Sequence, residues 1–359
     1  MNARTAAVLL VLLAALGGGT LLVRQQADSQ RPDDAASLGQ PLLKGLQAAQ
    51  VAAIAIRQPK DAITLQNKDG RWIIAERGGF PADFDRVHDF VLKAIGLKIG
   101  QSEPIGEKDR ARLYLDASGT AVEFLAADGK PLARFIAGRK YFKREPDNPE
   151  RAIADGRYVA LPGDEKRVYV VADPLAQASV KSADWISRAG IAVEKVKSLE
   201  IRHGEGPAGD DWKVERSGDN ADWKLAGAHA GEKLEVTKAN SAAYAFVGLD
   251  LADVAPKEAK PEETGLDKPS VVTATTLDGL GYVLKLGKLS GENYYASIVV
   301  SGEPKPEGKD AGERLKKLNE RLPREKGLAQ YVVLIPKARL EDVLKKRSEL
   351  LAKKEEKKK

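Results

Sequence analysis

The sequence predicts an α+β protein, with two tandem copies of a mostly antiparallel β unit and one packed helix in each copy, after an N-terminal transmembrane helix. Three observations predict this architecture. An uncharged apolar run lies near the N-terminus, short strand patterns follow one another in hairpins, and the same order of patterns occurs twice. The 359 residues are 43% hydrophobic, which is enough apolar material for one large or two ordinary cores.

Residues 5–23 read TAAVLLVLLAALGGGTLLV and contain no charged side chain. As a helix they would span about 28 Å, close to the ~30 Å hydrocarbon core of a bilayer. Arg4 and the amino terminus precede the run and Arg24 follows it, which favours a cytoplasmic N-terminus. We expect residues 1–24 to be an uncleaved signal anchor in a bacterial inner membrane, a single pass that binds the bilayer through residues 5–23. The bulk of the chain would then lie on the periplasmic side. A cleaved signal peptide is the alternative.

The rest of the chain divides into four predicted segments. Residues 25–45 begin with the polar run QQADSQRPDDAASLGQ and are expected to form a stalk. Residues 46–180 form the first predicted α+β repeat, and residues 181–345 form the second, which carries charged inserts. Residues 346–359 form a Lys-rich tail.

The duplication is seen first in the strands. Residues 51–57 and 196–202 each alternate apolar and polar positions, the pattern of a half-buried strand. In both copies a polar turn then leads to a strand near a tryptophan, Trp72 or Trp223. Residues 120–129 and 270–279 both end in Asp-Gly, which supplies the left-handed backbone of a tight hairpin. The remaining predicted strands cover residues 132–137, 157–159 and 168–171 in the first copy and 282–286, 294–296 and 331–334 in the second.

One helix is predicted within each copy. In the first, Asp83 is the predicted N-cap and the apolar positions fall at helical spacing. In the second, Thr237 lies near the cap. The apolar positions are Phe84, Val87, Val91 and Ile95 in the first helix and Val236, Ala243, Val247 and Leu251 in the second. Shorter helices are predicted at residues 183–188 and 311–322, and residues 255–269 are predicted to be a loop. An amphipathic helix is predicted at the C-terminus, with an apolar stripe of Leu340, Val343, Leu344, Leu350 and Leu351.

Composition argues against several functions. The chain has no Cys, so disulfides, thiolate metal sites and cysteine nucleophiles are excluded. The net charge is +6, but residues 337–359 hold ten Lys or Arg and five Asp or Glu, so the rest of the chain carries only +1. A nucleic-acid-binding domain carries its basic patch on the folded body, so we predict no nucleic-acid partner.

The residues that could bind a metal or a ligand have simpler structural interpretations. His88, His203 and His229 have no metal-binding spacing, and the residues around Asp219 and Asp222 fail the ligand spacing of a calcium loop. Trp72 and Trp223 are predicted to be core residues rather than stacking platforms. A further cluster, Asp83, Asp85 and Asp89, fits helix capping and the helix dipole.

Nucleophile and phosphate-loop motifs are absent from the sequence. We therefore assign no catalytic, cofactor-binding or metal-binding residue, predict no cofactor, and expect that the protein is not an enzyme. Paired carboxylates of a hydrolase have spatial rather than sequential spacing. An envelope hydrolase is therefore kept as a third alternative, ranked after protein binding and ligand binding.

The repeated pattern resembles the bacterial family called domain of unknown function 4340. The resemblance covers nearly all of residues 46–345, although Ala221 stands where the second copy would have the turn glycine. It implies an envelope protein without established activity, some of whose relatives are accessory components of gliding-type ABC transporters. It carries over no catalytic residues. The matching positions are Ile54, Ile56, Asp69, Gly70, Trp72, Pro81, Asp83, Val87 and Leu97, and then Ile201, Trp223, Asp278 and Gly279.

The anchor, the duplication and the missing catalytic motifs predict a non-catalytic protein that acts by protein–protein interaction. The expected partner is a membrane protein, such as an ABC-type transporter or an envelope assembly. The alternative is a periplasmic ligand-binding module that uses a cleft between the two copies.

Overall fold

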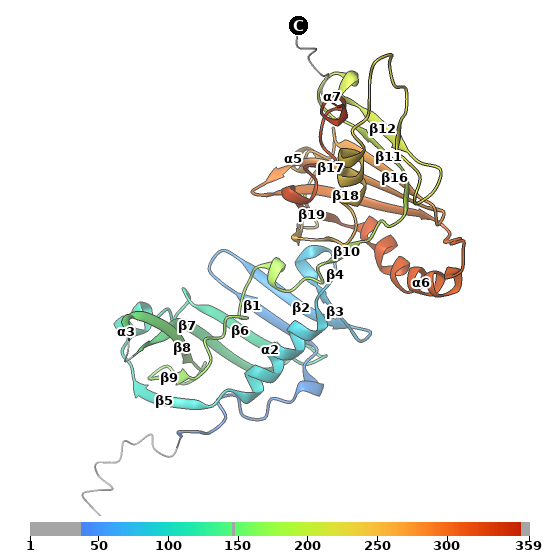
Figure 1. Ribbon diagram of the computed structural model, residues 1–359. Helices are drawn as coiled ribbons and strands as arrows, with labels where there is room; N and C mark the ends of the chain where they lie inside the picture. The colour runs from blue at the N-terminus through green and yellow to red at the C-terminus, as the bar shows by residue number, and fades with distance from the viewer. Residues whose placement is uncertain (1–36, 146–147, 353–359) are drawn as a thin grey trace, which may run out of the picture. The chain divides into compact units, whose positions relative to one another are not determined.

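The computed structural model describes residues 37–145 and 148–352 (Figure 1). These residues form mostly antiparallel sheets with a few helices, so the α+β prediction is confirmed. The predicted transmembrane segment and the end of the Lys-rich tail lie outside the described residues. No helix among the described residues is long and apolar enough to cross a membrane.

Contacts divide the chain into two compact units, one with residues up to 62 and 88–180, the other with residues 63–87 and from 181 onward. A nine-stranded sheet has the order β4-β3-β2-β1-β6-β7-β8-β9-β5, and its strand pairs are antiparallel. Its strands are β1 (Ala53–Arg57), β2 (Ala62–Lys68), β3 (Arg71–Ile74), β4 (Phe80–Pro81), β5 (Ile99–Pro104), β6 (Thr120–Leu125), β7 (Pro131–Glu145), β8 (Asn148–Ala160) and β9 (Arg167–Val171).

Helix α2 (Phe84–Gly96) covers one face of this sheet (Figure 1). Asp83 caps it, because the Arg86 amide donates to Asp83 Oδ1 at 3.2 Å. Phe90 is fully buried and its ring stacks on that of Phe124 with centroids 5.9 Å apart. The predicted apolar face of this helix is wrong at one position. Phe84 is 57% exposed, and the buried face instead includes Phe90 and Ala94. Helix α3 (Glu107–Arg112) follows β5.

The second sheet has eight strands in the order β13-β12-β11-β16-β17-β18-β19-β15. Its inward positions form a core of aliphatic side chains with Trp212 and Tyr282. A separate two-stranded sheet pairs β10 (Ala189–Ile191) with β14 (Leu249–Asp250). The eight strands are β11 (Val196–Arg202), β12 (Trp212–Glu215), β13 (Lys224–Leu225), β15 (Asp253–Val254), β16 (Ser270–Thr276), β17 (Leu280–Ser290), β18 (Asn293–Gly302) and β19 (Val332–Pro336).

Four helices accompany the second sheet. Helix α4 (Val236–Tyr244) buries Ala239, Ala242 and Ala243. Helix α5 (Pro261–Thr264) lies within the segment predicted as a loop and ends at Gly265 in the left-handed region. Helix α6 (Ala311–Gly327) confirms the helix predicted at 311–322 and extends it. Helix α7 (Arg347–Leu350) is a single turn near the C-terminus.

Two helix predictions were too long in the middle of the chain. The helix predicted from Val236 to Leu251 ends at Tyr244, because Gly248 adopts a φ of 63° and the chain then enters β14. The helix predicted at 183–188 is only a 3₁₀ turn, Ser182–Asp184. There the Ser187 amide donates to Pro81 O at 3.1 Å, so the backbone leaves the helical path.

The predicted C-terminal amphipathic helix is also wrong. Leu340, Val343 and Leu350 are buried as expected, but only Arg347–Leu350 is helical. The Trp212 indole donates to Lys345 O at 2.7 Å. A continuous helix is broken here because Lys346 is extended, with ψ at 158°.

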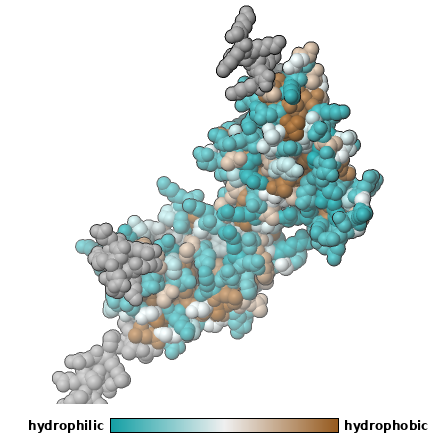
Figure 2. Space-filling view, viewed as in Figure 1, coloured by the Kyte–Doolittle hydropathy of each residue, from teal (hydrophilic) through white to brown (hydrophobic). Residues whose placement is uncertain are grey.

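The surface is dominated by hydrophilic residues. Figure 2 shows a face on which apolar residues gather only in small groups. Single exposed apolar side chains are normal for a folded protein, so a candidate site is instead a place where polar or aromatic residues gather around a hollow.

Candidate functional site

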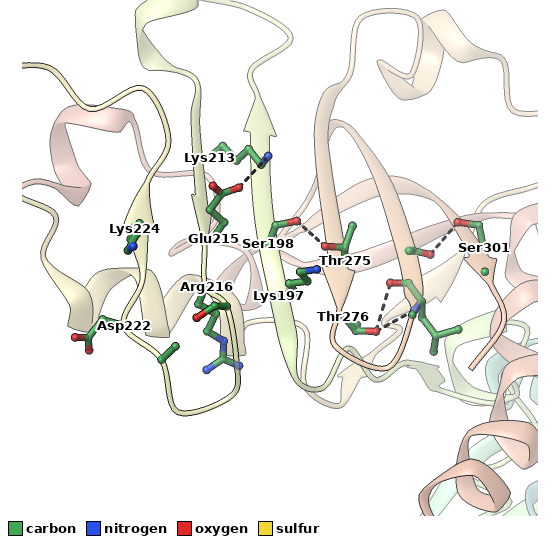
Figure 3. A pocket seen from close by; sticks show the side chains of 16 residues that line it. Lys197, Ser198, Lys213, Glu215, Arg216, Asp222, Lys224, Thr275, Thr276 and Ser301 are labelled. Carbon is green, nitrogen blue, oxygen red and sulfur yellow. Dashed lines mark hydrogen bonds and ion pairs between the residues drawn. The ribbon is translucent and has the colours of Figure 1, made fainter. Parts of the chain in front are cut away.

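The largest described hollow lies on the open face of the second sheet (Figure 3). It has a volume of about 930 Å³ and is lined by side chains from β11, β12, β16, β17 and β18, together with the turn before β13. Most of these residues are exposed, whereas Thr276 and Leu280 are buried. The hollow is therefore a wide depression that is open to solvent rather than an enclosed chamber.

A β-bulge places two polar residues of β11 in this hollow. The pairing of β11 with β16 shifts between Val196 and Ser198, so Lys197 is an extra residue on the β11 side. As a result Lys197 is exposed and Ser198 also lines the hollow, while Val196 on one side and Leu199 on the other are buried. The Ser198 and Thr275 hydroxyl oxygens lie 2.6 Å apart and share a hydrogen bond across the strands.

Glycines leave one end of the hollow without side chains. Gly302 has a φ of 88°, and a Cβ there would lie 2.4 Å from Gly279 O. Only glycine fits such a position without moving the backbone. Gly279 and Gly281 lie beside it in the lining, and Ser301 supplies an exposed hydroxyl.

Arg216 has a structural role in the wall of the hollow. Its side chain is only 8% exposed, and it forms an ion pair with Asp219 at 2.8 Å. Its Nε donates to Val196 O at 2.7 Å, and its guanidinium lies 4.8 Å from the centroid of the Trp223 ring. These contacts hold the turn before β13 against β11.

Two lysines in the hollow remain available. Lys213 pairs with Glu215 at 3.2 Å. By contrast, the exposed side chains of Lys197 and Lys224 have no hydrogen bond or ion pair with any described residue. The hollow therefore offers two unpaired cations beside a row of hydroxyl groups, with the Asp222 carboxylate at its rim.

The predicted histidine and aspartate candidates are dispersed. His203 bridges two segments, with Nδ1 3.3 Å from Asp211 Oδ1 and Nε2 3.3 Å from Leu344 O. His229 is exposed in a turn, and His88 lies on α2. Across residues 37–145 and 148–352, no group of three or more His, Cys, Asp or Glu could hold a metal ion.

The tryptophan interpretation is confirmed. Trp72 and Trp223 are 8% and 5% exposed, so neither offers a face for stacking. The Trp223 indole donates to Asn240 Oδ1 at 2.8 Å and thereby connects the sheet to α4. Asp219 forms the ion pair with Arg216 described above, which fits the predicted turn.

A buried polar network beneath the second sheet was not predicted. Glu325 of α6 is fully buried and accepts hydrogen bonds from the Ala192 amide at 3.0 Å and the Tyr282 hydroxyl at 3.1 Å. Burial, with the neighbouring Glu325 carboxylate as a smaller cause, raises the pKa of Tyr282 above its ordinary value. Arg321 Nε lies 3.4 Å from Glu325 Oε1. Arg321 Nε is buried and makes no hydrogen bond with the described residues, whereas Glu325 and Tyr282 hold α6 against the sheet, so the cluster has a structural role.

The lining of the open hollow was also missed by the sequence analysis. The alternation in residues 196–202 and 270–276 predicts that one side of each strand faces solvent. It does not predict which outward residues become neighbours, because that depends on the register between strands about 75 residues apart. The only local signal was the polar pair Lys197-Ser198 where strict alternation would place one polar residue.

Together the sheets, their register and the open hollow define a sheet-dominated α+β protein. A family model described as domain of unknown function (DUF4340) matches residues 72–269, more than half of the chain. The chain therefore belongs to this family, as the resemblance predicted. The match begins in β3 and ends just before β16. No curated protein and no solved structure matches the chain.

Proposed function

We propose that the protein is a non-catalytic, membrane-anchored envelope protein that binds another protein through the open hollow of its second sheet. The observation that carries the proposal is the hollow itself: a wide, solvent-open depression of the sheet that presents hydroxyl groups and two lysines with no ionic partner among the described residues. Such a surface suits an extended, polar and partly acidic segment of a partner, since hydroxyls and lysines donate hydrogen bonds along its length. The apolar run at residues 5–23 supports a partner in or at the membrane.

We further propose that the two sheets are copies of one unit. The order β3-β2-β1-β6-β7-β8-β9-β5 in the first sheet parallels the order β13-β12-β11-β16-β17-β18-β19-β15 in the second. In both orders a strand that comes after the helix pairs at the far edge with the last strand: β5 after α2 pairs with β9, and β15, which comes after α4 and β14, pairs with β19. A duplicated framework of this kind supplies binding surfaces rather than a single reaction centre, which agrees with an accessory of an ABC-type transporter or an envelope assembly.

Site-specific photo-crosslinking tests the proposed interaction. A photo-reactive phenylalanine replaces Thr275 in the hollow of the full chain, and the protein is irradiated in cells and purified from membranes in mild detergent. We expect a discrete crosslinked partner from position 275. Lys68 is the control position, because it is exposed on β2 and has no side-chain partner among the described residues.

Charge reversal makes this experiment decisive. Lys197→Glu together with Lys224→Glu should abolish the crosslink from position 275, whereas Lys68→Glu should leave it unchanged. Recovery of the full chain alone, or the same crosslinked products from positions 275 and 68, would overturn the proposal.

A ligand-binding module is the second candidate, and the size of the hollow favours it. Its volume of about 930 Å³ lies within the range of small-molecule sites, roughly 300–1,000 Å³. Thermal-shift measurements with acidic glycans and peptides of the cell envelope separate the two candidates. A ligand that binds the folded state raises the melting temperature by mass action, and the two lysine reversals should abolish that shift.

A further inference from the structure

A second hollow lies in the first unit, where β7 and β8 pass the segment that follows α3. It has a volume of about 550 Å³ and lies apart in sequence from the hollow described above. Of its eight lining residues, Arg139, Lys140 and Arg157 are cationic and none is acidic. The remainder are mostly aromatic or aliphatic, a composition that differs from the hydroxyl-rich hollow of the second sheet.

A bulge in β7 builds the cationic side of this hollow. The pairing of β7 with β8 moves from Ala137↔Val159 to Lys140↔Arg157, which leaves Gly138 and Arg139 as the bulge. A Cβ at Gly138 would lie 2.3 Å from Leu113 O, so the close approach of β7 requires glycine. The Arg139 amide donates to Leu113 O at 2.8 Å, and the side chains of Arg139 and Lys140 are both exposed.

Backbone carbonyls hold Arg157 in a fixed orientation. Its Nε donates to Gly138 O at 2.8 Å, and its Nη1 donates to Pro174 O at 3.1 Å and Leu175 O at 3.2 Å. Its Nη2 has no acceptor among the described residues. Burial lowers the pKa of Arg157, because the charge is partly removed from water.

None of the three cations is neutralised within the described chain. Arg139 lies 5.3 Å from the centroid of the Tyr114 ring, a cation–π contact, and Lys140 has no side-chain partner there. Arg157 bonds only to uncharged carbonyls. Three like charges around one hollow repel one another, which raises the free energy of the folded protein. An anion bound between them offsets this repulsion.

The hollow also has apolar lining. Tyr114 and Phe142 are 48% and 54% exposed, so both offer apolar surface. Tyr158 also lines the hollow, and its ring packs edge-on against Tyr141 with centroids 5.8 Å apart. A ligand with an apolar or aromatic body would cover these rings while its charged group meets the cations.

We propose that this hollow binds a phosphate ester that carries an apolar or aromatic body. The phosphate lies among Arg139, Lys140 and Arg157, and the body lies against Tyr114 and Phe142. Arginine suits this role, since its planar N–H groups match phosphate oxygens in pairs. The ester has two sources, a soluble metabolite or the headgroup of a phospholipid, and the experiment below distinguishes them.

Calorimetric titration of the full chain in nonionic detergent tests the site. The probe is phenylphosphonate, which has the anion and the ring but no ester bond to hydrolyse. We expect it to bind at least about tenfold more tightly than inorganic phosphate, and phenol not to bind measurably. The double variant Arg139→Gln/Lys140→Gln should weaken phenylphosphonate binding about tenfold or more. Both side chains are exposed, and far-ultraviolet circular dichroism verifies that the variant folds.

The control variant is Lys68→Gln, which removes one charge outside the hollow and should bind the probe as the wild type does. Equal binding by the double variant and the wild type, or no binding by the wild type, would overturn the proposal. Competition against the probe in detergent identifies the source. Stronger competition by short-chain phosphatidylglycerol than by phenyl phosphate supports a phospholipid headgroup, and stronger competition by phenyl phosphate supports a soluble ester.

Discussion

Glu325 and Asp278 show how single buried carboxylates fix α6 on the second sheet. Their residues are 0% and 2% exposed. Asp278 receives two hydrogen bonds from the Arg314 guanidinium. Arg314 and Arg321 both approach Glu194 Oε2, at 3.2 Å and 3.3 Å. A charged helix is thus held by ion pairs and hydrogen bonds, with Leu318 and Leu322 as its buried apolar contacts.

Removing the Glu325 carboxylate should be costly. Glu325→Ala leaves the Tyr282 hydroxyl and the Ala192 amide without their acceptor and leaves Arg321 without its i,i+4 partner. We expect the free energy of unfolding to fall by about 3–5 kcal/mol, because a buried charge network loses one member. Urea titration followed by tryptophan fluorescence measures this value.

Lys316→Ala is the matched control for that substitution. Lys316 is exposed on the same helix and has no side-chain partner among the described residues, so the change should lie within about 0.5 kcal/mol of wild type. A Glu325→Ala protein that unfolds at the same urea concentration as Lys316→Ala would show that the network does not stabilise α6.

At the scale of elements, an ion pair helps to attach the C-terminal segment to the residues before α4. Arg347 of α7 meets Glu232 at 2.7 Å, with side-chain exposures of 14% and 19%. The hydrogen bond from Arg347, followed by that from the His229 amide, lowers the pKa of Glu232 to about 2 from an ordinary value of 4.5. Backbone bonds from Glu235 to Leu350 O and from Ala352 to Lys233 O complete the attachment.

The lowered pKa of Glu232 predicts that acid weakens the attachment of the C-terminal segment. The folded-state pKa is below the unfolded value, so the ionised Glu232 contributes stability above about pH 4.5, and this contribution is lost as the pH falls toward 2. We expect wild type to be more stable than Glu232→Gln at pH 6, and the difference to shrink steadily between pH 4.5 and 2. Urea titrations of both proteins at each pH measure the difference.

A surface carboxylate without partners provides the comparison. Glu258 is exposed and forms no ion pair with a described residue, so Glu258→Gln should differ little from wild type at pH 6. If the Glu232→Gln difference stays constant down to pH 2, the ion pair with Arg347 does not stabilise the C-terminal segment in solution.

Local patterns predicted the strands better than the helices. Residues 196–202 were predicted as a strand and form β11 (Val196–Arg202), because alternation and the neighbouring turns are local properties. The helix expected at Leu340–Leu351 is interrupted at Lys346, whose backbone is extended, next to the Lys345 carbonyl that the Trp212 indole binds from 133 positions away. Periodicity reports which side chains are buried, and Leu340 and Leu350 are, but it does not report which carbonyls a distant side chain will occupy.

The two hollows illustrate the same limit for sites. Neither gathers residues that are close in sequence: the first needs the register of β11 with β16, and the second needs a bulge between β7 and β8. In the sequence, Arg139 is an ordinary surface residue and Lys197 shows only as a break in the alternation. Their significance comes from the absence of a carboxylate partner among the described residues, which only the folded arrangement reveals.

At the scale of the whole molecule, membership of the DUF4340 family tests neither the location nor the orientation of the chain. The proposed membrane anchor and periplasmic location rest on residues 5–23, an uncharged run whose length as a helix matches a bilayer core. Fusions made after Gln40 test it directly. Alkaline phosphatase, which folds in the periplasm, should be active there, and a β-galactosidase fusion at the same position should be inactive.

Two arginines introduced within the apolar run provide the decisive variant. Leu10→Arg/Leu13→Arg places two cations at its centre, each costing about 2.5–3.5 kcal/mol of insertion free energy. We expect this protein to leave the membrane fraction and the alkaline phosphatase fusion to lose activity, whereas Leu10→Ile/Leu13→Ile should behave as wild type. An active β-galactosidase fusion in the wild type would place the folded units in the cytoplasm, and a partner in the periplasm would then be excluded.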